Sequence, residues 1–135
     1  MKIIIDTNII LDVLCNRKDF VNDSLKIFKL CETKHIQGCI SALSIANIVY
    51  IMRKELDFSK IKEILSKLSL IFEIIDLEYD DLIKSSLLKF NDYEDSIQSV
   101  QASRVKADYI VTRNVKDFNN SKVLALKPNE LIERI

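Results

Sequence analysis

The chain has 135 residues, of which 48% are hydrophobic and 30% charged, with a single glycine and a single proline. This composition excludes a disordered chain, a glycine-rich phosphate loop and a low-complexity linker, and it indicates a single domain over residues 1–135 built mostly from helix. Twenty basic residues cancel twenty acidic ones, so any role on nucleic acid needs a local basic patch or a metal ion.

The cysteines point to a reducing compartment. Cys15, Cys31 and Cys39 are odd in number and lack paired spacing, and the opening residues do not have the pattern of a signal peptide. These features favour free thiols in a cytoplasm. No apolar run approaches the ~20 residues that span a membrane. We therefore expect a cytoplasmic protein with no membrane segment.

The predicted strands are short apolar runs. Ile3-Ile4-Ile5 is an unbroken β-branched run, typical of a strand buried on both faces in the middle of a parallel sheet. Further strands are expected at residues 38–41, 70–77, 109–112 and 123–126.

Apolar residues at helical spacing predict helices between these strands. The first expected helix, over residues 9–14, would be capped by Thr7 or Asn8. The helix expected over residues 80–90 would have Ile83, Leu87 and Phe90 on its inward face. The expected helices are 9–14, 22–34, 44–56, one from Asp57 or Ser59 to Leu68, 80–90, 95–106 and a last one from Pro128, with a polar loop at 113–118. The alternation predicts an α/β, three-layer fold with a central, mainly parallel sheet of four to five strands flanked by helices.

Polar side chains gather where predicted strands end or helices begin. The three clusters are Asp6-Thr7-Asn8, Asp92-Tyr93-Glu94-Asp95, and Arg113-Asn114 with Asp117. In a parallel sheet these positions share one edge, which is where such folds place their ligands. Carboxylates brought together without histidine or thiolate suit a hard cation, Mg²⁺ or Mn²⁺. Such a cation would relieve their mutual repulsion and activate a bound water.

The order and spacing of these clusters resemble the PIN domain, the nuclease fold of VapC-type toxins in bacterial toxin–antitoxin pairs. The resemblance covers essentially the whole chain, and the closing Thr-Arg-Asn-x-x-Asp-Phe is its most specific part. The matching segments are Ile4 to Asn8, Ile40 to Ser44, Asp95 to Gln98 with Ala102, and Val111 to Phe118.

The resemblance implies a metal-dependent endoribonuclease that hydrolyses RNA by metal-activated water. It also implies a homodimer whose site is blocked by a cognate antitoxin protein. Carried over to this chain, Asp6 matches the first metal-binding acid and Asp95 the acid of the later helix. Asn114 and Asp117 match the polar pair after the fourth strand, and Thr112 the hydroxyl that braces the site.

The chain departs from the family pattern at Asn47. The helix after Ser41 usually brings a glutamate to the site, and an amide at that position supplies no charge and cannot act as a base. Asp92, three residues before Asp95 and on the same helix face, is expected to replace part of the missing charge. Asn114 also stands where many relatives have aspartate, so the site is expected to hold two to four carboxylates.

Simpler interpretations stand beside these. Asp6, Asp95, Thr7 and Asn8 are all residue types that cap helices. Arg113 fits a phosphate contact or a surface salt bridge equally well. Two other functions stay open: a PIN-fold binding module that has lost catalysis, motivated by Asn47 and zero net charge, and a phosphoryl-transfer protein with Asp6 as nucleophile. The second is disfavoured because Asn8 stands where such hydrolases carry a second acid.

Overall fold

A five-stranded, all-parallel sheet forms the middle layer of the computed structural model, which describes residues 1–135. The strand order across the sheet is β3-β2-β1-β4-β5. The strands are β1 (Lys2–Ile5), β2 (Gln37–Ser41), β3 (Glu73–Ile75), β4 (Tyr109–Val111) and β5 (Leu124–Leu126). This arrangement confirms the predicted α/β fold, with the first strand at the centre of the sheet.

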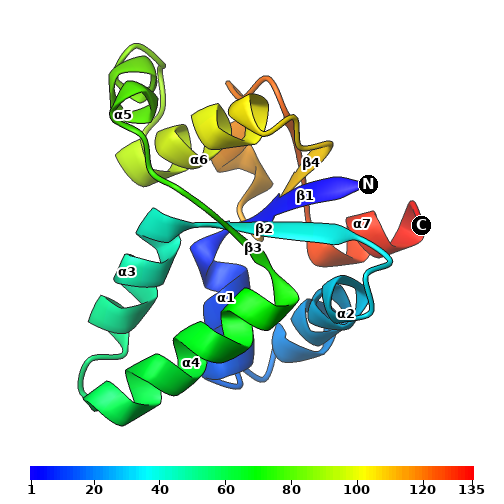
Figure 1. The fold of residues 1–135 in the computed structure, drawn as a ribbon. Coiled ribbons are helices and arrows are strands. Elements are labelled where there is room, and N and C mark those ends of the chain that lie inside the picture. The colour runs from blue at the N-terminus through cyan, green and yellow to red at the C-terminus, as the bar shows by residue number, and fades with distance from the viewer.

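Helices cover both faces of the sheet (Figure 1). One face carries α1, α2, α4 and α7, the other carries α6 with the short 3₁₀ helix η1, and α3 extends beyond the end of β2. The helices are α1 (Thr7–Leu14), α2 (Val21–Glu32), α3 (Ala42–Ile51), α4 (Phe58–Ile71), α5 (Tyr79–Ser86), α6 (Tyr93–Arg104), η1 (Val115–Phe118) and α7 (Pro128–Glu133). No helix is both long and apolar enough to cross a membrane, and all three cysteines are free.

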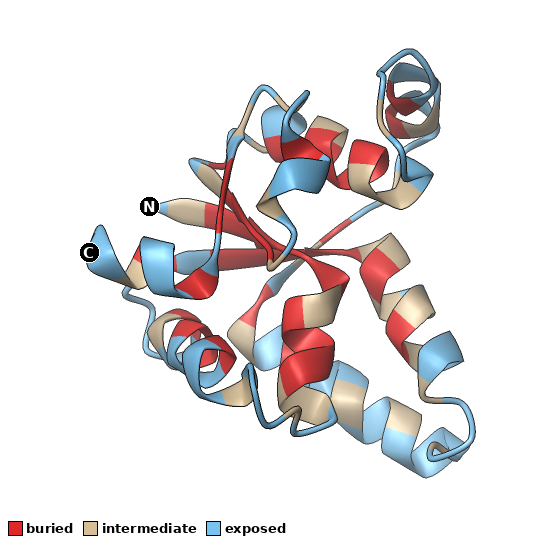
Figure 2. Ribbon diagram, turned by 180° about the vertical axis from the view of Figure 1, so that it is seen from behind, coloured by how far each residue is buried: buried red, intermediate tan, exposed pale blue.

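The three isoleucines of β1 divide between two hydrophobic cores, as a strand buried on both faces requires. Ile3 and Ile5 pack into the larger core, under α1, α2, α4 and α7, and Ile4 packs into the smaller one, under α6 and η1. All three are fully buried, and the strands are the most buried part of the molecule (Figure 2). Burying each of these side chains contributes roughly 1.5–3 kcal/mol.

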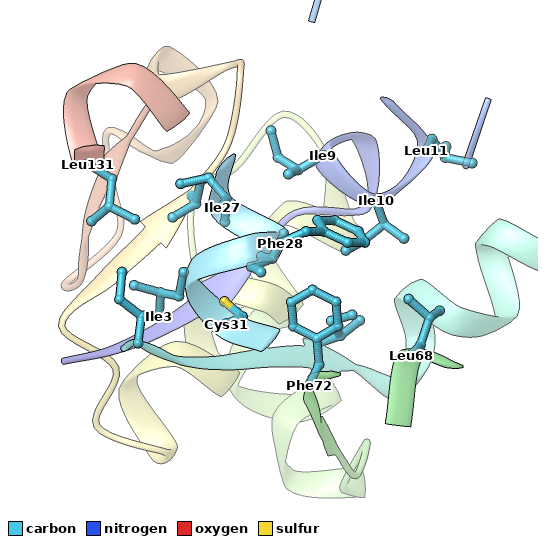
Figure 3. Packing of buried hydrophobic residues seen from close by; sticks show 14 of the residues in the cluster. Ile3, Ile9, Ile10, Leu11, Ile27, Phe28, Cys31, Leu68, Phe72 and Leu131 are labelled. Atoms are coloured by element: carbon cyan, nitrogen blue, oxygen red, sulfur yellow. The ribbon is translucent and has the colours of Figure 1, made fainter. Parts of the chain in front are cut away.

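Aromatic packing closes the larger core on its β2 side. Phe28 of α2 meets Phe72 edge to face, with the ring centroids 5.0 Å apart (Figure 3). Gly38 of β2 lies against the same ring, and a Cβ at this position would fall 2.6 Å from Cys31 Sγ and 2.8 Å from Phe72 Cδ1. The chain's only glycine is therefore required for close packing.

The direction of chain progression reverses at β1, and this reversal locates the functional site. From β1 the chain builds β2 and then β3 on one side, and it then crosses over to place β4 and β5 on the other side. The switch point lies between β1 and β4, and open parallel sheets bind ligands just beyond the carboxyl ends of the strands at that point. Asp6 follows β1 and Thr112 follows β4.

The predicted strand at 70–77 was too long. Leu70 and Ile71 belong to α4, and the strand spans only Glu73–Ile75. Leu68, Ile71 and Phe72 pack against the larger core at helical spacing while Leu70 is exposed. This short apolar run fits a helix and a strand equally well by pattern, and the packing of Leu68 and Ile71 decides for the helix.

The inward face predicted for residues 80–90 was wrong for Ile83 and Leu87, whereas Phe90 does pack against the smaller core, beyond the end of the helix at Ser86. Leu87 is 79% exposed and Ile83 is 44% exposed, whereas Asp81 and Ser85 are buried. Helix α5 packs against α6 and lies away from the sheet (Figure 1), so its inner face is polar. The guanidinium of Arg104 on α6 donates to Asp81 through Nε and Nη2, both at 3.0 Å.

Helix α3 is shorter than the predicted 44–56. It begins at Ala42, where Ser41 caps it by accepting a hydrogen bond from the Leu43 amide, and it ends at Ile51. Met52 still packs against the larger core, but Arg53, Lys54 and Glu55 are charged and exposed, so no apolar face supports another turn. The Arg53 guanidinium instead donates to the Tyr50 carbonyl at 2.8 Å, satisfying one of the carbonyls left free at the helix end.

Candidate functional site

Asp6 lies at the centre of the candidate site. It is the N-cap of α1 in extended backbone conformation, in place of the predicted Thr7 or Asn8, but its carboxylate makes no capping hydrogen bond. The side chain is 5% exposed. One carboxylate oxygen accepts from Gln98 Nε2 at 3.1 Å and the other from Thr112 Oγ1 at 2.8 Å. The carboxylate is therefore held from α6 and from the end of β4.

A cavity of about 430 Å³ opens beside Asp6. It brings together the predicted site residues from four separate segments, with the exception of Thr112 and Arg113. Five carboxylates and four asparagine amides line it, together with one hydroxyl and two apolar side chains, and no lysine, arginine or histidine does. The lining residues are Asp6, Thr7, Asn8, Asn47, Tyr50, Ile51, Asn91, Asp92, Glu94, Asp95, Asn114 and Asp117.

The first turn of α6 carries three of these carboxylates. Asp92 is the N-cap, and its Oδ1 accepts from the Asp95 amide at 3.0 Å. Glu94 Oε1 accepts from Thr7 Oγ1 at 2.8 Å. Acidic side chains at a helix N-terminus are stabilised by the helix dipole, which offsets part of their mutual repulsion. Asp92 therefore combines a capping role with a place in the cavity wall.

Burial, together with nearby negative charge, raises the pKa of two carboxylates in the cavity. Burial raises the pKa of Asp95 to about 7, and the charges of Asp6, Asp92, Asp117 and Glu94 add to the effect. Burial also raises the pKa of Asp6, although the hydrogen bonds from the two side chains that hold it oppose the shift. The cavity thus concentrates negative charge for which the protein supplies no cationic partner.

The donor set fits a hard divalent cation in its chemistry. Carboxylate and amide oxygens are the ligands that Mg²⁺ and Mn²⁺ prefer, and Mg²⁺ retains several waters in a site of this kind. A cation would also offset the repulsion that raises the pKa of Asp95. No three or more acidic, histidine or cysteine side chains converge closely enough to form a compact metal-binding group. The carboxylates are instead distributed around the cavity.

Thr112 and Arg113 have supporting positions outside the cavity. Thr112 is buried, and besides donating to Asp6 its hydroxyl accepts from the Asn114 amide at 3.0 Å. Arg113 is turned away toward α1, where its Nε lies 3.0 Å from Oδ2 of the fully buried Asp12. Its guanidinium also stacks over Phe20 at 3.8 Å. The salt bridge predicted for Arg113 is therefore present, but its partner is a buried carboxylate and not a surface one, and the phosphate contact stays a prediction.

Replacing Arg113 by methionine should destabilise the fold by about 2 kcal/mol, because Asp12 would keep only a 3.4 Å contact with Arg17 and a 3.2 Å hydrogen bond from Ser24. Differential scanning calorimetry should show Tm lower by about 8 °C. The affinity for Mn²⁺ should stay within about twofold of wild type. An unchanged Tm combined with weaker RNA binding would instead assign Arg113 to phosphate.

The matched control for this prediction is Arg134→Met. Arg134 also stacks on an aromatic ring, that of Tyr109, with 5.4 Å between the guanidinium and the ring centroid, and it is exposed. Because no buried carboxylate depends on it, its loss should change Tm by less than about 2 °C.

Three residues that the structure places at the site were named only as members of a predicted cluster or matching segment, without a role of their own. Glu94 lines the cavity, Gln98 holds Asp6, and Ser44 lies 2.8 Å from Thr7 Oγ1. Gln98 lies three residues after Asp95, which is one helical turn, so its position on the same helix face was available as a signal. The Oε1 atom of Gln98 is buried without a hydrogen-bond partner, a cost that indicates a positional role.

The fold and the cavity together define the class of protein. It is an α/β protein with an all-parallel sheet and an acidic site at the switch point between β1 and β4. A family model described as "PIN domain" matches residues 2–116. The chain belongs to the PIN domain family, as its sequence motifs predicted. PIN domains are typically nucleases that use divalent metals.

Solved structures with the same fold come from toxin–antitoxin complexes. A chain of VapBC2 from Rickettsia felis, bound to a DNA fragment from the promoter, is 18% identical with a TM-score of 0.72, covering 94% of this chain and 98% of that chain. A toxin–antitoxin complex from Klebsiella pneumoniae gives 22% identity and a TM-score of 0.68, with coverage of 93% and 96%. A chain of FitAcB from Neisseria gonorrhoeae is 17% identical with a TM-score of 0.69, covering 93% of this chain and 97% of that chain. The comparison with curated proteins gives no match.

Proposed function

We propose that this protein is a Mg²⁺- or Mn²⁺-dependent endoribonuclease and the toxin of a toxin–antitoxin pair. The observation that carries the proposal is the cavity at the switch point, which five carboxylates and no cationic side chain line. Membership of the PIN family supports the reaction class, and the likeness to chains from toxin–antitoxin complexes supports the biological role.

Asp6, Asp95, Asp92 and Asp117 are the proposed metal-holding carboxylates, and Asn47 adds an amide oxygen. The bound cation would supply charge neutralisation at the phosphate and a lowered pKa for an attacking water. Thr112 and Gln98 fix the orientation of the Asp6 carboxylate through their hydrogen bonds. The Asn114 amide group, exposed at the cavity rim, is placed to orient the scissile phosphate or its water.

Electrostatics explain why an RNA substrate needs the cation. The cavity is negative and the chain carries no net charge, so a phosphodiester approaching the metal-free cavity is repelled. A divalent cation bound between the carboxylates reverses the local sign at the place where the phosphate must lie. RNA binding in the cavity is therefore expected to depend on metal, and not only RNA cleavage.

The proposed partners follow from the same likeness. We expect an antitoxin protein that covers the acidic cavity and a homodimeric assembly. A toxin of this kind acts on intracellular RNA, which places the proposed activity in the cytoplasm. The exposed apolar side chains Tyr50 and Ile51 lie at the cavity wall, where a partner would bury them.

A binding module without catalysis is the alternative function. Asn47 favours it, because an amide occupies the position where the family usually brings a glutamate. The lack of a compact metal-binding group favours it as well. The same protein would then bind RNA or its partner without breaking a phosphodiester bond.

The test is incubation of the purified protein with a mixed RNA pool that includes a circularised RNA. Cleavage is expected with Mn²⁺ or Mg²⁺ and not with EDTA, and linearisation of the circle would identify an endonuclease. The Asp6→Asn variant is the control for contaminating nucleases. Equal cleavage by the wild type and this variant would overturn the nuclease proposal, and RNA binding without cleavage would favour the binding module.

A further inference from the structure

The site lacks one negative charge on the α3 side. Asn47 lines the cavity from α3, and no acidic residue of that helix does. The other carboxylates come from the end of β1, from the first turn of α6 and from η1. A carboxylate that takes the place of an acid on α3 must therefore reach the cavity from another element.

Glu94 of α6 is hydrogen-bonded to α1 and, through Thr7, linked to α3. Its Oε1 accepts from Thr7 Oγ1 at 2.8 Å, and Thr7 directly follows Asp6 in the chain. The Thr7 hydroxyl also lies 2.8 Å from Ser44 Oγ on α3. Because Thr7 has a single hydroxyl proton and an ionised Glu94 can only accept, Thr7 donates to Glu94 and Ser44 donates to Thr7. This chain of hydrogen bonds fixes Glu94 relative to both helices.

Ser44, which anchors Glu94 through Thr7, lies on the same face of α3 as Asn47. Ser44 and Asn47 are three residues apart, a spacing that places side chains on one side of a helix. Thr7 and Ser44 are both buried, whereas Glu94 is partly exposed to the cavity. One oxygen of Glu94 is thus used for anchoring, and the Glu94 Oε2 atom has no hydrogen-bond partner within the protein and remains free for a ligand. The negative charge of Glu94 also contributes to the raised pKa values of Asp6 and Asp95, so it acts on the same volume.

We infer that Glu94 supplies the metal-site carboxylate that this chain lacks at Asn47, reaching the cation from α6 instead of α3. The inference rests on the proposed function, because it concerns the same cavity and the same cation. It makes Glu94 a metal-binding residue and Thr7 and Ser44 its positioning residues.

Glu94→Gln is the sharpest test, because the glutamine Oε1 can still accept from Thr7 while the charge is lost. Mn²⁺ affinity, measured by isothermal titration calorimetry and by EPR of free Mn²⁺, should fall by about 10-fold or more. RNA cleavage should fall by about 100-fold. Glu133→Gln removes the same charge from the exposed end of α7, outside the cavity, and both quantities should stay within about twofold of wild type.

A charge swap separates this role from a purely structural one. The double variant Asn47→Glu with Glu94→Gln returns a carboxylate to the cavity from the α3 side. It should recover at least about tenfold in Mn²⁺ affinity or in cleavage relative to Glu94→Gln alone. Circular dichroism and Tm close to wild type for all variants would confirm that they fold.

The outcomes distinguish this inference from the proposed function. If the wild type binds Mn²⁺ and cleaves RNA while Glu94→Gln matches Glu133→Gln in Mn²⁺ affinity, the assignment of Glu94 is wrong and the proposed function stands. If Glu94→Gln loses affinity but the swap recovers none of it, Glu94 does not replace an α3 acid. If the wild type neither binds Mn²⁺ nor cleaves RNA, both proposals fail together.

Discussion

Asp6→Asn is expected to lower the rate of RNA cleavage by about 10³-fold, because it removes the most buried carboxylate of the cavity and with it a charge that the cation requires. The measurement is single-turnover cleavage at saturating Mn²⁺, where weaker metal affinity is compensated. Asp6 is the only carboxylate of the cavity held through both oxygens, by Gln98 and Thr112. Its position is therefore the best defined in the site.

The same substitution should not destabilise the protein. Burial raises the pKa of Asp6, which means that the folded structure disfavours its charge, and an amide avoids that cost. The unpaired Gln98 Oε1 becomes useful here. A rotation of the Gln98 amide would let this oxygen accept from the new amide group, while the remaining oxygen still accepts from Thr112. We expect Tm to stay equal to wild type or to rise by about 2–4 °C.

The combination of lost cleavage and retained stability distinguishes a functional carboxylate from a structural one. Asp12 provides the contrast, since it is fully buried but paired with Arg113 and Arg17. Asp12→Asn should lower Tm. A Tm that falls in Asp6→Asn to the extent seen in Asp12→Asn would show that Asp6 serves the fold instead of the cation.

The fold was predictable because its strongest signals are local. The Ile3-Ile4-Ile5 run predicted the central strand, and the packing of Ile4 against one core and of its neighbours against the other is what an unbroken apolar run requires. The errors fall where a short apolar segment fits two structures. Leu70 and Ile71 extend α4 because their helical neighbour Leu68 packs in the core. The polar inner face of α5 depends on Arg104, a partner that local pattern does not reveal.

The position of the site could be predicted from the sequence, but the residues that form it could be predicted only in part. Residues that follow strand ends, such as Asp6 and Asn114, could be placed at one edge of the sheet from chain order alone. Glu94 could be placed near the site as part of a polar cluster, but its individual role depends on the contact with Thr7, which is 87 residues away in the sequence. Arg113 illustrates the opposite limit: its sequence position beside Asn114 is that of a site residue, yet its side chain turns toward Asp12. Side-chain direction depends on tertiary partners.

Asp95 should make stability depend on pH in the direction opposite to an ordinary salt-bridged carboxylate. Its pKa is about 7 in the folded protein and near 3.8 when unfolded, so the folded state binds the proton more tightly. The contribution of Asp95 is therefore most favourable below pH ~4 and declines as pH rises to ~7, above which the full cost of the charge is present.

The variant Asp95→Asn removes this cost. At pH 4 and below its Tm should lie close to that of the wild type, and at pH 8 it should be about 5 °C higher. This corresponds to about 1.5 kcal/mol once the shift is discounted for the partial exposure of Asp95. Asp19→Asn, at an exposed position outside the cavity, should show no such trend. A gap between wild type and Asp95→Asn that is the same at pH 4 and pH 8 would contradict the raised pKa.

Metal binding should abolish the same penalty, because a cation between the carboxylates favours the ionised form of Asp95. Adding 10 mM MgCl₂ or MnCl₂ at pH 8 is expected to raise the Tm of the wild type by several degrees, and EDTA should reverse the rise. The rise should be smaller in Asp95→Asn, which has lost both the repulsion and one metal-binding group. If metal stabilises both proteins equally, Asp95 does not face the cation, and the metal-holding set would reduce to Asp6 and the remaining carboxylates of the cavity.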